Sequence, residues 1–513
     1  MSSSNPPVDL DNCAREPIHI LGNIQPHGVL FVLSPEHFTC LQVSANVDHF
    51  LGRSVEDYLG KRLNFFLDEE QIEALRFALS VVDPTENNPV RLGLHSKHEP
   101  ILLEGIVHSH DGFHFLELEP SAEANQTYFL DFYKAVSKAT LEIQSAPDLK
   151  TLLDIAARQY QRITGFDRVM IYKFHSGEVG QVIAESVKDD YGTFLDLYYP
   201  ASDIPEQARK LYVLNPIRLI SDVNAAPVPI VPAVNPQSGR PIDLSYAGLR
   251  AVSAIHIEYL KNMGVSASMS VSIVRNGKLW GLVACHHYRG AHFVPYETRK
   301  ACTFIGEVLS LEIAAKESKA EYEYQVNSTV LQARFLERLA GNAGMEALVD
   351  RSPNLIDFLD AQGAAVVSKG SVHAIGTTPA YDDISSMATW FEQRNMPALI
   401  TDCLSEIYVS AGAMKAVSSG VLALEISRTD HTYIMWFRPE QPRVVTWAGN
   451  PNKPVEVSEG SFRLSPRKSF EAWKESVGGR SFPWGEAEVR AALNLRKVLS
   501  LALFTKGSEK HGE

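Results

Sequence analysis

Short apolar runs alternate with polar turns along the first 120 residues. Apolar and polar positions alternate there with the period of two that is typical of half-buried strands. The pattern predicts strands at residues 28–33, 41–44, 100–107 and 113–118, with a short helix around 54–59. The start of the chain is therefore expected to form a small antiparallel sheet.

The middle of the chain mixes helical and strand patterns. It predicts a helix at residues 148–164 and strands at 168–174, 181–185, 268–274 and 279–285. Asn276-Gly277 is a strong signal for a two-residue hairpin between the last two strands. Residues 227–248 are rich in Pro, Gly and Asn, and so long a loop is expected to be functional.

A long run with few helix breakers, residues 296–339, predicts a connecting helix. Its apolar positions suit either a parallel dimer seam or a structural spine. Beyond it, strands are predicted at 421–426 and 433–437 and a final helix at 486–504. Residues 447–484 are punctuated by Gly and Pro at both ends and are too polar to form core.

Composition restricts the class of protein. A chain of 513 residues with 45% hydrophobic residues is expected to form about three domains with sizeable cores. The net charge of −13 argues against nucleic acid or an anionic membrane as the main partner. No apolar run is long enough to span a bilayer and no signal peptide is evident, so a cytoplasmic protein is expected.

The five cysteines form no paired framework and no Cys-x-x-Cys, which predicts free thiols in a reducing compartment. Cys40, Cys302 and Cys403 have apolar neighbours and are expected in the core. Cys13 lies in a polar leader beside Arg15, where a thiol can be accessible and partly ionised. From the residues alone, Cys13 is either reactive or an incidental exposed cysteine.

Asp203 lies between Pro200 and Pro205, just before a helical pattern. Proline fixes its own φ and pushes the preceding residue toward extended conformations, so this segment is expected to be stiff. It is suited to aiming a carbonyl and a carboxylate at a ligand. Asp203 is equally consistent with a helix cap.

Several motifs in order resemble the phytochromes. They are Asp203-Ile204-Pro205 and the histidine segments Ser253-Ala-Ile-His256 and Cys285-His286-His287. The leader, Asp11-Asn-Cys-Ala-Arg-Glu-Pro-Ile-His19 followed by Ile24-Gln-Pro-His-Gly28, is similar to the bacterial branch. The resemblance extends over nearly the whole chain, to Ser465-Pro-Arg-Lys-Ser-Phe470.

This resemblance implies an α+β fold of three consecutive antiparallel-sheet domains joined by long helices. They would be a leader and PAS domain at residues 1–125, a GAF chromophore-binding domain at 126–318 and a PHY domain at 319–513. A tongue would occupy about 447–484, and the 227–248 insertion would encircle the leader as a figure-of-eight knot.

The resemblance also implies biliverdin, a linear tetrapyrrole, as cofactor, joined to Cys13 by a thioether. Other branches carry their anchor cysteine directly before the equivalent of His256, where this chain has Ile255. Arg218 and Arg250 would hold one propionate, since a guanidinium reads a carboxylate bidentately; ordinary surface ion pairs are the alternative. The remaining residues implied to contact the cofactor are Tyr212, Ser253, Ser268, Ser270, Ile204, Pro205, His256, His286, Tyr172, Tyr199 and Tyr259.

Within this set, His256 and the Asp203 carbonyl match partners of the pyrrole N–H groups, and His286 matches the partner of the ring D carbonyl. The three tyrosines match a cage around ring D. Leu197 departs from the family, where histidine or glutamine is common. A metal site at Cys285-His286-His287 is not expected, because neighbouring residues on a strand point to opposite faces.

The implied switch joins Asp203 to Arg467 in the dark. After illumination Ser469 would replace the arginine while the tongue exchanges strand for helix. The implied function is a red/far-red photoreceptor and the input module of a signalling protein. Implied partners are a second copy of the chain and a downstream histidine kinase or response regulator.

Two other classes remain open from the sequence. A sensor histidine kinase is one, although no phosphoacceptor helix, nucleotide-binding module or phosphate loop is recognisable in these 513 residues, which are not expected to be an enzyme by themselves. A GAF domain for a cyclic nucleotide is the other, and it leaves Cys13 and Arg467 without a role.

Overall fold

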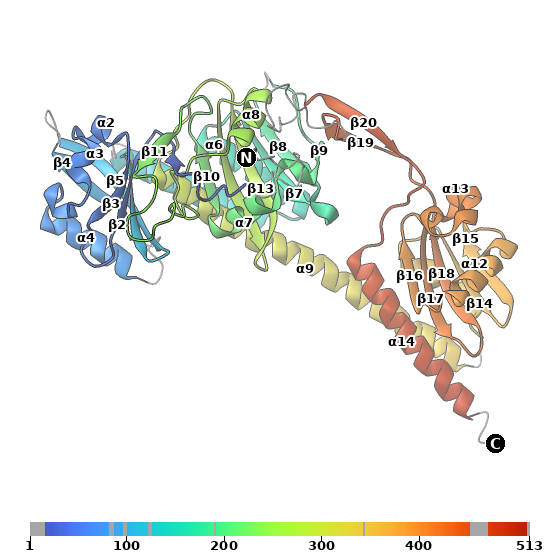
Figure 1. Cartoon of the computed structure of the whole chain (residues 1–513). Coiled ribbons are helices and arrows are strands. Elements are labelled where there is room, and N and C mark those ends of the chain that lie inside the picture. The colour runs from blue at the N-terminus through green and yellow to red at the C-terminus, as the bar shows by residue number, and fades with distance from the viewer. Residues whose placement is uncertain are drawn as a thin grey trace, which may run out of the picture. The chain divides into compact units, whose positions relative to one another are not determined.

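The computed structural model describes residues 16–81, 87–95, 100–121, 126–188, 191–341, 344–451 and 470–509. The chain divides into two compact units (Figure 1). The first comprises residues 1–314 with 446–473, and the second comprises 315–445 with 474–513. Cys13, Arg467 and Ser469 lie outside the described residues.

A seven-stranded sheet lies in the N-terminal part of the first unit. Its strand order is β1-β11-β3-β2-β6-β5-β4, and its paired strands are antiparallel. The strands are β1 (Asn23–Ile24), β2 (Val29–Leu33), β3 (Cys40–Ser44), β4 (Val90–His95), β5 (Pro100–His110), β6 (Phe113–Pro120) and β11 (Val228–Val231). The associated helices are α2 (Val47–Leu51), α3 (Val55–Tyr58), η1 (Leu63–Phe65) and α4 (Glu69–Ser80).

Local sequence explains where these helices begin. Asp68 and Gln71 form a capping box at the start of α4, where each side chain accepts a hydrogen bond from the other residue's backbone N–H. The apolar face of α4 contributes Ile72, Leu75 and Ala78 to the core beneath the sheet.

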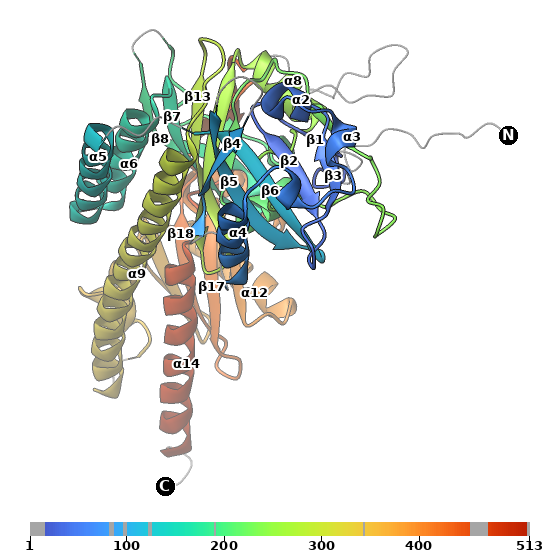
Figure 2. The same cartoon turned by 90° about the vertical axis from the view of Figure 1, so that its left-hand side faces the viewer.

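The second sheet of this unit has the order β10-β12-β13-β7-β8-β9-β19-β20. Its strands are β7 (Arg168–Phe174), β8 (Gly180–Val187), β9 (Tyr198–Tyr199), β10 (Ile217–Ile220), β12 (Ala267–Arg275), β13 (Lys278–His287), β19 (Arg443–Ala448) and β20 (Ala472–Val477). Its helices are α5 (Gln126–Ser145), α6 (Leu149–Thr164), η3 (Ser176–Glu178), η4 (Ala201–Asp203), α7 (Glu206–Leu214), α8 (Ala254–Asn262) and α9 (Tyr296–Ala340). Helices α5 and α6 lie side by side (Figure 2).

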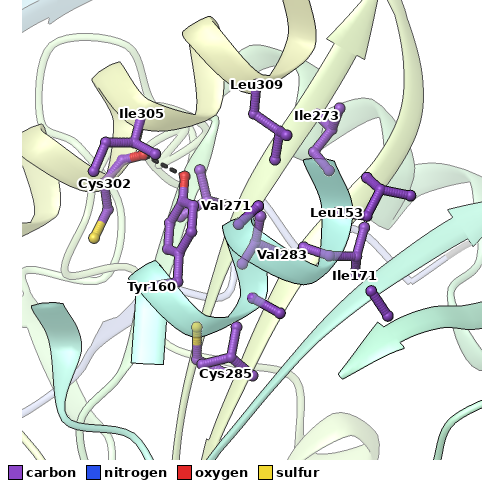
Figure 3. Packing of buried hydrophobic residues seen from close by; sticks show 14 of the residues in the cluster. Leu153, Tyr160, Ile171, Val271, Ile273, Val283, Cys285, Cys302, Ile305 and Leu309 are labelled. Atoms are coloured by element: carbon purple, nitrogen blue, oxygen red, sulfur yellow. Dashed lines mark hydrogen bonds between the residues drawn. The ribbon is translucent and has the colours of Figure 1, made fainter. Parts of the chain in front are cut away.

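One face of this second sheet is covered by an apolar core. Val271, Ile273 and Val283 on the strands pack with α6 and α9 residues, including Leu153 and Leu309 (Figure 3). The Tyr160 hydroxyl is buried there and donates a 2.6 Å hydrogen bond to the Cys302 carbonyl. A buried hydroxyl needs such a partner, because an unsatisfied one costs free energy of folding.

The second unit contains a five-stranded antiparallel sheet, ordered β15-β14-β18-β17-β16. The strands are β14 (Gly363–Ser368), β15 (Ser371–Gly376), β16 (Ala398–Thr401), β17 (Gly420–Ser427) and β18 (Thr432–Arg438). The helices are α10 (Ala347–Asp350), α11 (Leu355–Phe358), α12 (Tyr381–Gln393), η5 (Leu404–Glu406), η6 (Val409–Met414), α13 (Lys415–Ser418) and α14 (Glu486–Glu509). Both sheet faces are buried: α14 and the end of α9 pack on one, and α12 packs on the other.

The predicted α+β class with antiparallel sheets is confirmed, as are the predicted long helices. Asn276 and Gly277 both adopt positive φ, 50° and 72°, as a tight hairpin requires. The 227–248 stretch is not wholly loop, because its β11 residues pair with β1 and β3 of the first sheet. None of the described helices combines the length and apolar character needed to cross a membrane.

The Tyr160 contact allows a test of the core. Tyr160→Phe removes the buried hydroxyl and leaves the ring in place, so we expect a loss of about 1 kcal/mol in unfolding free energy of the first unit. Tyr133→Phe is the matched control, since Tyr133 is 62% exposed. Denaturant unfolding measures both variants, and equal stability of Tyr160→Phe and wild type would contradict the assigned hydrogen bond.

Candidate ligand-binding site

Strand register places a set of polar side chains on one face of the second sheet. Arg218 on β10 lies opposite Ser270 on β12, and Ser268 lies opposite His286 on β13. Tyr172 on β7 lies opposite Leu282, which shares the face of His286 by the alternation along β13. This is the face away from the Tyr160 core, because Val271, Val283 and Cys285 occupy the alternate positions.

The segment between the two prolines borders the same face. Pro200 and Pro205 both have extended ψ, 154° and 164°, and Asp203 ends the short helix η4 between them. Pro205, not Asp203, occupies the N-cap of α7. The Asp203 carboxylate instead accepts a 3.0 Å hydrogen bond from the Tyr259 hydroxyl, so the helix-cap interpretation of Asp203 does not hold.

Helix α8 presents His256 and Tyr259 together. Their rings stack with centroids 6.0 Å apart. Ser253 is the N-cap of this helix, and its hydroxyl accepts a 3.3 Å hydrogen bond from the His256 backbone N–H. Ser253 therefore has a structural contact that the sequence analysis did not foresee.

Aromatic side chains line the neighbouring region. Tyr172 and Tyr199 lie with ring centroids 5.6 Å apart, and both are buried. They belong to an apolar cluster that also contains Leu197, with Ile204 and Tyr212 packed against it. The predicted tyrosine cage is thus divided between this cluster and Tyr259 on α8.

Two histidines at the site are neutral at pH 7. Burial lowers the pKa of His286 to about 3, aided by the charges of Arg168 and His256. Burial and Arg218 lower the pKa of His256 to about 4. The His286 Nδ1 atom is buried and has no hydrogen-bond partner among the described residues. Such an atom needs a partner that these residues do not supply.

Arg218 and Arg250 form a close cationic pair. Arg218 donates hydrogen bonds to the backbone carbonyls of Gly248, Arg250 and Ala251. Arg250 Nη1 donates to the Ile18 carbonyl at 2.9 Å, and its buried Nε finds no hydrogen-bond partner among the residues that the structure describes. Burial lowers the pKa of both guanidinium groups.

No ion pair joins either arginine to a carboxylate within the described part of the chain. Arg250 is only 8% exposed, so the surface-salt-bridge interpretation does not apply to it. Two largely desolvated cations with no carboxylate in ion-pair contact are costly, which makes this the place where a negatively charged ligand group fits best.

The described leader residues contact this arginine pair. Besides the Ile18 contact, the Ala251 amide donates to the Asn23 carbonyl and the Leu244 amide donates to the His19 carbonyl. Gln25 Nε2 donates to the Leu219 carbonyl beside Arg218. The knot predicted for this region stays a prediction.

Two described residues of the predicted tongue, Trp447 at its start and Phe470 further along, also reach the site. Trp447 on β19 pairs in parallel with Tyr198 on β9. The Phe470 ring lies edge-on to Tyr259, with centroids 4.9 Å apart. The rest of the predicted Arg467 and Ser469 switch falls outside the described residues.

Sequence reasoning missed one ion pair that braces the site. Arg168 pairs with Glu185 in the interior, and its guanidinium lies 4.0 Å from the Phe194 ring centroid. Glu185 also accepts hydrogen bonds from the Phe194 amide, at the start of the segment leading to Leu197. A buried ion pair on neighbouring strands has no local sequence signature.

The described residues contain no cluster of three or more His, Cys, Asp or Glu side chains able to hold a metal. Cys285 packs in the core and His287 contacts Asp167, whereas His286 faces the site. This arrangement agrees with the alternation expected along β13.

Comparison with known proteins places the chain in a family. Residues 13–121 match the PAS fold, 148–316 the GAF domain and 328–507 the phytochrome region. The chain is 45% identical to cyanobacterial phytochrome B of Nostoc sp. over 98% of its length and 67% of that relative. It is 34% identical to a bacteriophytochrome of Xanthomonas campestris, over 98% of the chain and 80% of the relative.

The chain belongs to the phytochrome family. Two solved structures are similar at 40% identity: bacteriophytochrome RpBphP3 of R. palustris, with a TM-score of 0.86, and the Stigmatella aurantiaca phytochrome photosensory core module, with 0.85. They cover 96% and 97% of this chain, and 99% of each solved chain. The chain spans about two thirds of the length of cyanobacterial phytochromes A and B of Nostoc sp..

The phytochrome assignment identifies the chain as the photosensory core of a light receptor, with PAS, GAF and PHY domains in that order.

The neutral state of His286 predicts a pH effect on stability. Its pKa is about 3 when folded and 6.5 when unfolded, so between these values the unfolded chain binds more protons. Without ligand, we expect the unfolding free energy of wild type to fall as the pH drops below about 6.5. His286→Gln should lack this part of the decline, which is at most about 1.4 kcal/mol per pH unit. Unfolding at pH 5 and pH 7 measures it; the same pH dependence in both proteins would contradict a neutral His286.

Proposed function

We propose that this phytochrome core binds biliverdin and acts as the red/far-red input module of a signalling protein. The observation that carries the proposal is the pair of Arg250, which is buried, and Arg218, which is half-buried. The described residues supply no carboxylate in ion-pair contact with this pair, which lies near two neutral histidines and a tyrosine-lined region. A linear tetrapyrrole with two propionates supplies the charges and polar groups that complement this set. When bound, it would supply the light absorption and the bridge isomerisation that turns ring D.

Each group of residues has a role in this proposal. Arg218 and Arg250 bind the ring B propionate, assisted by Tyr212 and Ser253. Ser268 and Ser270 bind the second propionate. Support comes from the shared face of Arg218, Ser268 and Ser270, and from the unsatisfied Arg250 Nε. The unsatisfied His286 Nδ1 likewise marks a side chain with hydrogen-bonding capacity to spare.

The pyrrole N–H groups are assigned to His256 and the Asp203 backbone carbonyl, and the ring D carbonyl to His286. Ile204, Pro205 and the three tyrosines Tyr172, Tyr199 and Tyr259 form the surrounding wall. Leu197 lies in the apolar cluster with Tyr172 and Tyr199. Leucine cannot donate a hydrogen bond, so we propose that this position alters the photoproduct relative to family members with histidine there.

Cys13 is proposed as the covalent anchor. Its thiol adds across the double bond of the ring A side chain, forming one C–S bond while the thiol hydrogen passes to carbon. The described leader supports this, since Ile18 and Asn23 already contact the segment of Arg250 and Ala251. Ile255, directly before His256, cannot form a thioether.

Signal output is proposed to pass through the tongue and the long helices. Arg467 pairs with Asp203 in the dark, Ser469 replaces it after illumination, and the tongue at about 447–484 refolds. The domains are proposed at 1–125, 126–318 and 319–513, with a second copy of the chain and a histidine kinase or response regulator as partners. The contacts of Tyr259 with both Asp203 and Phe470 support a link between pocket and tongue.

The anchor assignment is tested by mass spectrometry after incubation with biliverdin. We expect a pigment-bearing peptide that contains Cys13, and in Cys13→Ser a pigment released on denaturation. A bilin attached to Cys40 or Cys285, or one released from the wild type, would show that the anchor is wrong.

The switch is tested with Arg467→Ala. Separation of a buried ion pair costs about 3 to 5 kcal/mol, so the dark tongue conformation should be destabilised while attachment to Cys13 is retained. Hydrogen exchange across residues 447–484, dark and illuminated, measures the change, with Lys468→Ala as control. Identical protection of the wild type in both light conditions would rule out the proposed tongue switch.

A further inference from the structure

The segment of residues 248–251, next to the arginine pair, is bound by an acidic side chain from the first sheet. Glu117 on β6 is 1% exposed, and its two carboxylate oxygens accept hydrogen bonds from successive backbone amides. Oε1 accepts from the Gly248 N–H at 3.1 Å and Oε2 from the Leu249 N–H at 2.6 Å. Hydrogen bonds to a carboxylate are stronger than neutral ones, so this is a firm attachment point.

A positively charged side chain binds most carbonyls of the same segment. Arg218 donates to the carbonyls of Gly248, Arg250 and Ala251. The Leu249 carbonyl accepts from the Gln25 amide at 2.7 Å. Every carbonyl from residue 248 to 251 is therefore occupied, while the amides of 248 and 249 depend on Glu117.

The segment carries one arginine of the pair and orients the other. Arg250 follows Leu249 directly, so a shift of the Leu249 amide moves the Arg250 backbone. Arg218 comes from β10 of the second sheet, and its guanidinium is oriented by carbonyls of the segment that Glu117 holds. One carboxylate from the PAS sheet thus binds the segment that carries Arg250 and whose carbonyls accept hydrogen bonds from Arg218.

Glu117 also affects the charge balance at the pair. Burial and Arg250 lower the pKa of Arg218, whereas the charges of Tyr212 and Glu117 raise it. Burial raises the pKa of Glu117 itself to about 7, opposed chiefly by the Leu249 amide. The carboxylate is held despite its desolvation, which is a cost that a purely apolar residue at this position would avoid.

We propose that Glu117 is a positioning residue for recognition of the ligand's carboxylates. It acts through the 248–251 segment on Arg218 and Arg250 and does not itself touch the ligand. This inference rests on the proposed function, in which these arginines bind a propionate.

The test compares two ligands that differ in charge. Affinity is measured by absorbance titration in a Cys13→Ala background, where attachment cannot mask weak binding. Biliverdin carries two carboxylates, and its dimethyl ester carries none. Glu117→Gln keeps the side-chain size but turns one oxygen into an amide that faces a backbone N–H. We expect about tenfold weaker binding of biliverdin and less than twofold weaker binding of the ester.

Glu104→Gln is the matched control. Glu104 is also 1% exposed, lies on β5 beside β6, and one of its oxygens has no hydrogen-bond partner among the described residues. None of its hydrogen bonds reaches the 248–251 segment, so binding of both ligands should match that of the parent protein. Hydrogen exchange of a peptide spanning 247–251, without ligand, should be faster in Glu117→Gln alone.

The outcomes separate the inference from the proposed function. If the parent protein prefers biliverdin over the ester and Glu117→Gln loses both ligands equally, or neither, Glu117 does not position the arginines and the proposed site stands. If the parent protein does not distinguish the two ligands, the carboxylate site itself is wrong and the inference fails with it. Unchanged exchange at 247–251 in Glu117→Gln would also overturn the inference.

Discussion

Two guanidinium groups, of buried Arg250 and half-buried Arg218, have no carboxylate in ion-pair contact among the described residues, and they set the constraints on this photosensory core. Backbone carbonyls satisfy most N–H donors of Arg218 and one of Arg250, but carbonyls do not neutralise charge. The surrounding chain compensates in part: the leader supplies the Ile18 carbonyl, and the nearby Glu117 carboxyl raises the pKa of Arg218. In our account, the positive charge that remains makes the site selective for an anionic ligand.

In the GAF sheet, core residues and site residues alternate along the same strands, so one face packs the core and the other forms the site. Val271 and Val283 face the core around Tyr160, while Ser270 and His286 on the same two strands face the site. A register slip by one residue would exchange these faces, so the well-packed core also fixes the site. The Asn276-Gly277 hairpin helps to set that register.

Much of the fold could be predicted from the sequence because its signals are local. The period of two in β12 and β13, the breaker-free run of α9 and the Asp148 cap of α6 each lie within one segment. The family resemblance singled out Arg218, His256 and His286, and their roles toward a ligand stay predictions.

Contacts between distant segments could not be predicted in this way. β11 pairs with β3, where Ile230 lies opposite Ser44, and Glu117 binds amides 131 and 132 residues further along the chain. Ser253 shows the reverse case: its capping role had a local signal, a serine directly before a helical pattern, but the family role drew attention away from it. Glu117 had a weaker signal, an acidic residue between the apolar Leu116 and Leu118 in a predicted strand.

The central claim is that this face of the GAF sheet holds a light-switchable anionic chromophore. Absorption spectra of the chain with biliverdin, before and after red light, test it most directly. Our account predicts a red-absorbing bound pigment in the dark that red light converts to a spectrally distinct second form. A spectrum that stays that of free biliverdin, or a bound pigment that red light leaves unchanged, would contradict it.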